Sequence, residues 1–109
     1  MDIKDIQKEA WQTADDNGFH SDPLKVGKIT HMSEVMSDAM MIALIHSEAS
    51  EALEALRRDD RKGFAEELAD IVIRVCDLAE IRRIDLTDEI AVKMEKNRER
   101  EYKHGGKLF

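Results

Sequence analysis

Four carboxylates in two pairs are the residues of this chain whose types and spacing suit chemistry. Glu48 and Glu51 form the first pair, and Glu67 and Asp70 form the second. The members of a pair are three residues apart, so on a helix their side chains lie on one face, about 60° apart around the axis. Two such pairs on facing helices would gather four negative charges, which repel one another unless a cation lies between them. Carboxylate oxygens favour Mg²⁺, and Mg²⁺ in turn indicates a phosphate-bearing substrate.

The same acidic residues also fit a purely structural interpretation, the solvent-facing stripe of an amphipathic helix. On the later helix that stripe would comprise Glu67, Asp70, Arg74 and Asp77. Two features favour a metal site instead. Both pairs share one spacing and lie on consecutive helices joined by a short connection, and antiparallel neighbours of this kind bring their inward faces together. Asp70 also lies among apolar residues, where a solvated charge is less expected. Spacing alone leaves both interpretations open.

A di-iron bundle is a competing kind of metal site, and the histidines exclude it. That site requires a Glu-x-x-His motif on each of two helices. Among the four histidines, only His104 has a glutamate three residues earlier, Glu101, and this pair lies in the C-terminal tail. Redox iron is therefore not expected.

Composition predicts one all-α domain spanning residues 1–109, a bundle of about four helices. The chain has 109 residues, of which 38% are charged and 42% hydrophobic, with only five Gly and one Pro. This balance suits a helical protein better than a sheet or a disordered segment. The formal net charge of −7 makes nucleic acid an unexpected partner.

The chain carries no sign of secretion or membrane insertion. Its first residues are charged, and no apolar run is long enough to span a bilayer. The single cysteine, Cys76, cannot form an internal disulfide and lies in an apolar stretch, so we expect a buried small hydrophobe. A soluble cytoplasmic protein without a membrane partner is the expectation.

Apolar periodicity, caps and breakers predict the elements that must position the carboxylates. Helices are expected over about residues 2–17, 30–58 and 63–83, with a fourth that is capped by Asp85 or Thr87 and runs to about residue 103. Gly18 is a natural stop for the first helix. The expected apolar face of the third helix comprises Phe64, Leu68, Ile71, Val72, Val75, Leu78 and Ala79.

The second predicted helix, residues 30–58, is long for so small a domain. It contains neither Gly nor Pro, and one continuous helix of that length would measure about 43 Å. Its first half is rich in methionine: Met32, Met36, Met40 and Met41. We therefore expect a homodimer or homotetramer in which this helix packs on another subunit. The alternative is a kink near Ser37 that folds the stretch back onto its own core.

The acidic motifs and their surroundings resemble a known family. Glu48-x-x-Glu51 followed by Glu67-x-x-Asp70 resembles the E-x-x-E…E-x-x-D signature of the MazG-like all-α nucleoside triphosphate pyrophosphohydrolases. Dimeric dUTPases and phosphoribosyl-ATP pyrophosphatases are relatives of that family. Residues 93–98 are similar to its K-x-x-x-N element, and the sequence His-Gly-Gly-Lys near the C-terminus resembles the tail of its small members. The likeness covers roughly residue 42 to the C-terminus.

This resemblance implies hydrolysis of an NTP or dNTP to the monophosphate and pyrophosphate, with Mg²⁺, or Mn²⁺ in its place, as the cofactor. The expected metal ligands are Glu48, Glu51, Glu67 and Asp70. The ions would bridge phosphate oxygens and neutralise developing charge while a water attacks the α-phosphorus. Glu51 is expected to assist that water as the catalytic residue.

Further residues are candidates for holding the nucleotide. Family similarity makes Lys93 and Asn97, one turn apart on the fourth helix, phosphate contacts. Lys107 follows two glycines that would let it reach a phosphate, and the alternative is a frayed terminus. Three rings near the end of the first helix are candidates for contacting the base: Trp11, Phe19 and His20. For Trp11 the alternative is a core anchor.

Two other functions stay open. A phosphoribosyl-ATP pyrophosphatase-like enzyme would use the same carboxylates, so only substrate tests would separate it. A non-catalytic helical interaction protein is the alternative from another class. That alternative predicts that Glu48→Gln and Asp70→Asn leave the behaviour of the protein unchanged, or stabilise it by relieving repulsion.

Overall fold

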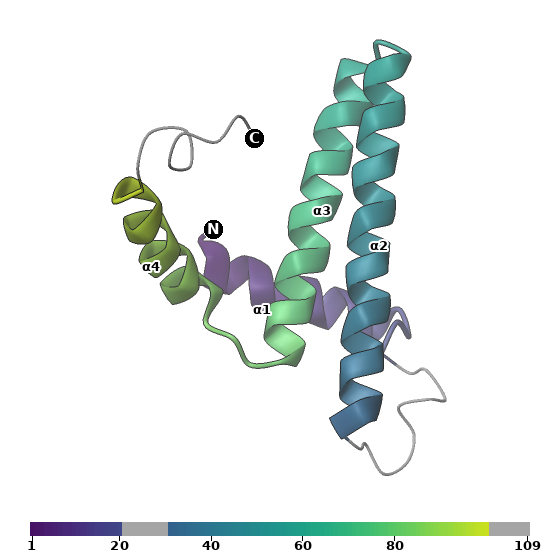
Figure 1. Ribbon diagram of the computed structural model, residues 1–109. Coiled ribbons are helices and arrows are strands. Elements are labelled where there is room, and N and C mark those ends of the chain that lie inside the picture. Colours follow the sequence, from purple (N-terminus) through teal and green to yellow (C-terminus); the bar gives the residue numbers. More distant parts are fainter. Residues whose placement is uncertain (21–30, 101–109) are drawn as a thin grey trace.

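The computed structural model describes residues 1–20 and 31–100 (Figure 1). Within these ranges the chain forms four helices and no strand, which confirms the predicted all-α bundle. The helices are α1 (Ile3–Asp16), α2 (His31–Arg57), α3 (Arg61–Ile81) and α4 (Leu86–Arg98).

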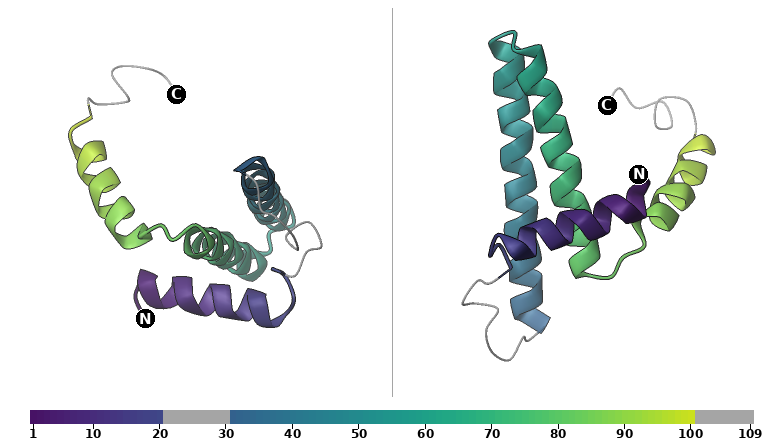
Figure 2. Two further views of the ribbon diagram at one scale, coloured as in Figure 1. Left: turned by 90° about the horizontal axis from the view of Figure 1, so that it is seen from below. Right: turned by 180° about the vertical axis from the view of Figure 1, so that it is seen from behind.

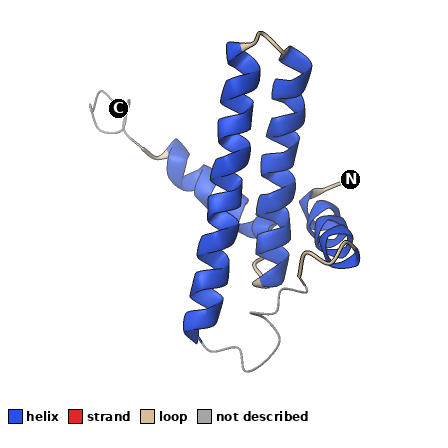
Figure 3. Cartoon of the chain, turned by 90° about the vertical axis from the view of Figure 1, so that its right-hand side faces the viewer, coloured by secondary structure: helices blue, strands red, loops and turns tan. Residues whose placement is uncertain are grey.

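Helices α2 and α3 form an antiparallel hairpin and lie side by side in Figures 1 and 3. The hairpin turns through Asp59, whose φ of 54° lies in the left-handed region. Asp60 then caps α3 by accepting a hydrogen bond from the Gly63 backbone N–H at 2.8 Å. This cap starts α3 at Arg61 rather than at Gly63, because the capping side chain satisfies N–H groups of the first turn. The short turn sets the faces of the two helices opposite each other.

Helix α1 runs crosswise over α3, as Figure 2 shows from below and from behind. It ends as the sequence predicted, with Gly18 at a φ of 78° beyond the last turn. Gln7 on this helix is 3% exposed. Its side-chain amide donates to the Ile84 carbonyl oxygen at 3.0 Å, and its amide oxygen accepts from the Leu86 N–H at 3.2 Å. Through these bonds α1 holds the connection between α3 and α4.

Helix α4 stands apart from the α2–α3 hairpin, and α1 is its main contact (Figures 1 and 2). Asp85 is its N-cap, as predicted, and accepts from the Asp88 N–H at 3.1 Å. No residue of α4 is buried against the described chain. The helix therefore presents almost its whole surface to solvent in a single chain.

The buried core of the described chain is small. Its hydrophobic members are Ala10, Met41, Ala52, Ala55, Cys76 and Ala79. The prediction that Cys76 is buried is confirmed, since its exposed fraction is 0%.

The predicted apolar face of α3 is only partly right. Leu68 and Val72 are each 46% exposed, because no other described element covers that side of the helix. Helix α2 shows no break near Ser37, so the alternative of a kinked second helix is wrong. No helix among the described residues is long and apolar enough to cross a membrane.

Candidate functional site

Three of the predicted ligands meet between α2 and α3. Glu48 from α2 and Glu67 and Asp70 from α3 each offer a carboxylate oxygen, and these oxygens lie within 4.8 Å of one another. The hairpin explains this meeting, since antiparallel neighbours joined by a short turn face each other along their length. Glu67 Oε2 is shielded from solvent and has no hydrogen-bond partner among the described residues. We call Glu48, Glu67 and Asp70 the carboxylate cluster.

The closeness of the carboxylates shifts the pKa values of Glu67 and Glu48 in opposite directions. The pKa of Glu67 is raised to about 7, most of all by hydrogen bonding with Glu48 and then by burial and by the charges of Glu48, Asp70 and Glu51. The pKa of Glu48 is lowered, because Glu48 shares that hydrogen bond and accepts another from Arg74. Crowded carboxylates of this kind hold a proton where a cation would otherwise balance the charge.

Glu51 lies outside this group of three. It is exposed one turn along α2 from Glu48, yet its charge still raises the pKa of Glu67. Its assignment as a metal ligand and as the catalytic residue stays a prediction.

Arg74 belongs to the site, although the sequence interpretation gave it only to the solvent-facing stripe. Its Nε donates to Glu48 Oε1 at 2.9 Å, and the two side chains are 32% and 16% exposed. The guanidinium carbon lies 5.8 Å from the centre of the Phe19 ring. Arg74 follows Asp70 by four residues, and this helical spacing was the signal in the sequence that could have identified it.

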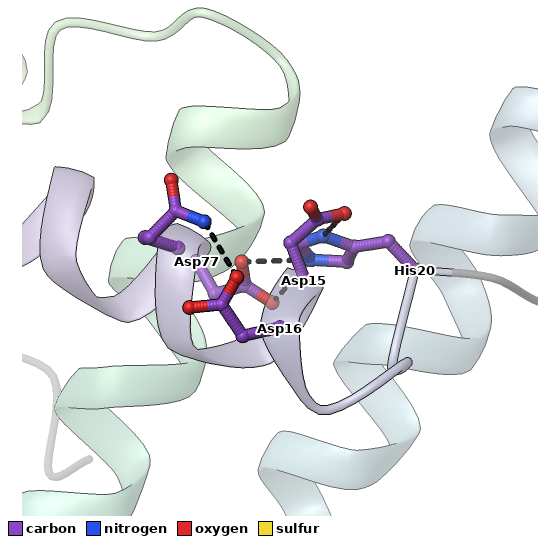
Figure 4. Close-up of polar contacts among 5 residues, drawn as sticks. Asp15, Asp16, His20 and Asp77 are labelled. Atoms are coloured by element: carbon purple, nitrogen blue, oxygen red, sulfur yellow. Dashed lines mark hydrogen bonds and ion pairs between the residues drawn. The ribbon is translucent and has the colours of Figure 1, made fainter.

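Of the three candidates for contacting the base, His20 is already engaged by protein groups (Figure 4). Its Nε2 lies 3.0 Å from Asp77 Oδ1 and its Nδ1 lies 3.3 Å from Asp15 Oδ1. Trp11 packs beside it, with 5.2 Å between ring centres. Phe19 is 38% exposed, and the guanidinium of Arg74 lies over its ring. These contacts hold the end of α1 against α3, and the base-contact prediction for the three rings stays open.

The interpretation of Asp77 as a solvent-facing residue is wrong. The spacing placed it on a solvent-facing stripe, but its exposed fraction is 4%. The reason is tertiary, because α1 crosses this part of α3 and brings His20 onto the carboxylate.

The predicted phosphate contacts are not assembled with the carboxylates in one chain. Lys93 and Asn97 are exposed on α4, and that helix stands away from the α2–α3 hairpin in Figures 1 and 2. Lys107 lies outside the described residues. All three assignments stay predictions.

The carboxylate cluster fits a hard divalent cation. It offers only oxygen donors, which Mg²⁺ and Mn²⁺ prefer. The buried Glu67 oxygen without a partner supplies an unused acceptor inside the cluster, and a buried acceptor left unsatisfied is costly. The neighbouring carboxylates raise the pKa of Glu67, and a cation among these oxygens would balance their charge.

Comparison with known proteins agrees with this arrangement. The family model described as the MazG nucleotide pyrophosphohydrolase domain matches residues 36–104, more than half of the chain and all of the carboxylate cluster. No curated protein and no solved structure matches the chain. The match over α2, α3 and α4 shows that this chain belongs to the MazG nucleotide pyrophosphohydrolase domain family.

Proposed function

We propose that the chain is a Mg²⁺-dependent nucleoside triphosphate pyrophosphohydrolase that converts an NTP or dNTP to the monophosphate and pyrophosphate. The observation that supports this most is the carboxylate cluster, whose oxygens lie within 4.8 Å of one another inside the region matched by the family model. Mn²⁺ would suit the same oxygen donors.

Each residue of the site has a role in this proposal. Glu48, Glu67 and Asp70 would hold the metal, with Glu51 as a further ligand. A divalent cation bound there supplies charge neutralisation on the phosphates and on the departing pyrophosphate. Glu51, exposed beside the cluster, would take the proton of the water that attacks the α-phosphorus.

The working form would be a homodimer or homotetramer. Large apolar side chains are exposed on α2 and α3: Val35, Met36, Met40, Ile42, Leu53, Leu56, Leu68, Val72 and Ile73. An apolar surface of this extent on two paired helices is typical of a subunit interface. A second copy would also offer a route for a helix bearing Lys93 and Asn97 to approach the carboxylates.

The decisive experiment is a pyrophosphate-release assay over canonical and modified NTPs and dNTPs, with Mg²⁺, with Mn²⁺ and with EDTA. We expect metal-dependent release with a clear nucleotide preference. Glu48→Gln and Asp70→Asn should each lower kcat/KM by about 100-fold or more while circular dichroism shows the helices retained.

The matched control is Glu54→Gln, because Glu54 lies on the same helix but is exposed and pairs with Arg57 at 3.1 Å. This variant should keep its activity. No release from any nucleotide by folded protein would turn the test to phosphoribosyl-ATP, and failure there would leave the non-catalytic interaction protein.

A further inference from the structure

Arg74 is held beside the carboxylate cluster by two contacts, one to a carboxylate and one to an aromatic ring. Nε donates to Glu48 Oε1 at 2.9 Å, and the Phe19 ring lies under the guanidinium carbon at 5.8 Å. The Arg74 side chain is 32% exposed, so it is restrained by protein contacts and still accessible. Arginine stacked on an aromatic ring loses less freedom when it binds a further acceptor.

The terminal nitrogens of Arg74 make no hydrogen bond to the described part of the chain. Within residues 1–20 and 31–100, the bond from Nε to Glu48 is the one hydrogen bond of Arg74, and neither Nη1 nor Nη2 donates one. Arg82 at the end of the same helix shows the contrast. There Nε donates to both Asp38 oxygens at 2.8 and 2.9 Å, and Nη2 reaches the Glu34 carbonyl oxygen at 3.4 Å. Arg82 therefore uses its guanidinium to hold α2 and α3 together, whereas Nη1 and Nη2 of Arg74 remain available to a ligand.

Available donors beside metal-binding carboxylates suit an anion rather than another protein group. The planar guanidinium presents parallel N–H groups that match two oxygens of a phosphate. A triphosphate bound through metal ions at Glu48, Glu67 and Asp70 would carry its non-bridging oxygens past this position. The lysine and asparagine predicted for that role lie on α4, away from the cluster in a single chain.

We propose that Arg74 is a substrate-contacting residue whose Nη1 and Nη2 donate to phosphate oxygens of the nucleotide, with Glu48 and Phe19 fixing the guanidinium. This assignment rests on the proposed function. It adds to the site a phosphate contact carried by the same helix as two of the metal ligands, so one helix presents both the cation-binding oxygens and the donors for the anion.

The test uses inorganic tripolyphosphate with Mg²⁺ as the probe, measured by calorimetry beside a titration with Mg²⁺ alone. Arg74→Gln should weaken tripolyphosphate binding by about tenfold or more, while affinity for Mg²⁺ alone falls by less than about threefold. Arg74→Lys keeps the charge but not the planar fork, and should bind at least about threefold more weakly than the unsubstituted protein. Arg57→Gln is the matched control, because it removes the same charge from an arginine that is 70% exposed and pairs with Glu54. This variant should bind tripolyphosphate as tightly as the unsubstituted protein.

Four results would overturn the assignment, three of them from the variants. One is unchanged tripolyphosphate affinity in Arg74→Gln, another is full affinity in Arg74→Lys, and the third is an equal loss of affinity for Mg²⁺ alone, which would mean that Arg74 acts only through Glu48. Absence of tripolyphosphate binding by the unsubstituted protein would overturn it as well. Failure of the proposed function looks different: the unsubstituted protein would bind tripolyphosphate in an Arg74-dependent way and yet release pyrophosphate from no nucleotide.

Discussion

The imidazole of His20 and the carboxylate of Asp77 meet at 3.0 Å across 57 residues of sequence. Their side chains are 10% and 5% exposed, and Asp15 lies on the other ring nitrogen at 3.3 Å. The contact joins the last turn beyond α1 to the middle of the C-terminal half of α3. Phe19, the neighbour of His20, in turn lies against Arg74, so the same contact supports one wall of the carboxylate site.

Asp77→Ala should therefore destabilise the fold. Removing one partner of a buried hydrogen bond leaves the other partner buried and unsatisfied, which typically costs about 1–3 kcal/mol. Urea unfolding of Asp77→Ala, His20→Ala and the double variant would measure the coupling between the two residues. We expect a coupling free energy of about 1 kcal/mol or more, whereas additive effects would show that the contact contributes little. The control is Asp16→Ala, because Asp16 lies near this contact but is exposed.

Gln7→Ala should loosen the attachment of α4. The buried amide bonds the Ile84 carbonyl and the Leu86 N–H, and removing it leaves both backbone groups without that partner, at a cost of about 1–3 kcal/mol. Hydrogen exchange should quicken at the start of α4 more than in α2. Gln12→Ala is the matched control, since Gln12 lies on the same helix but is exposed and bonds only Asp16. Equal destabilisation by the two variants would contradict the role given to Gln7.

The stability of the metal-free protein should fall as pH rises through neutrality. Glu67 has a pKa of about 7 in the folded chain against an ordinary 4.5. The folded state binds this proton more tightly, so its stabilising contribution is complete below the ordinary pKa and is lost as pH rises through the folded one. In EDTA, Glu67→Gln should gain in Tm relative to the unsubstituted protein between about pH 5 and about pH 8.

Bound metal should offset the loss of stability that the metal-free protein shows as pH rises. Mg²⁺ bound to the folded state stabilises it by about 2.7 kcal/mol at 100 times the dissociation constant. Addition of Mg²⁺ near pH 8 should raise the Tm of the unsubstituted protein and raise that of Glu67→Gln less. A Tm difference between the two proteins that does not change with pH would show that Glu67 titrates normally.

Met40→Glu should dissociate the proposed oligomer. Met40 is 49% exposed on the apolar surface of α2, and a charge placed in a subunit interface has to be desolvated. Size exclusion with light scattering should show a multiple of the 12.5 kDa chain mass for the unsubstituted protein and a shift toward that single mass for the variant. Lys62→Glu, at an exposed polar position, should leave the mass unchanged. A monomeric unsubstituted protein would refute the proposed assembly.

Local features of the structure could be predicted from the sequence because short-range bonds determine them. The caps at Gly18 and Asp85 involve groups within a few residues, and the spacing of Glu67 and Asp70 puts both on one face of any helix they occupy. The all-α class followed from the same kind of evidence, since composition and apolar periodicity act along the chain. The short hairpin made the approach of Glu48 to that pair predictable as well.

Only the tertiary structure decided which polar side chains of α3 face protein. Arg74 and Asp77 share one helical stripe in the sequence with Asp70, but α1 crosses α3 and brings Phe19 and His20 onto the two of them. The position of α4, away from the carboxylates, likewise depends on long-range bonds such as that from Gln7 to Ile84. Periodicity states which residues share a face of a helix, whereas the partner of that face is set by how separate helices pack, and that information is not contained in local spacing.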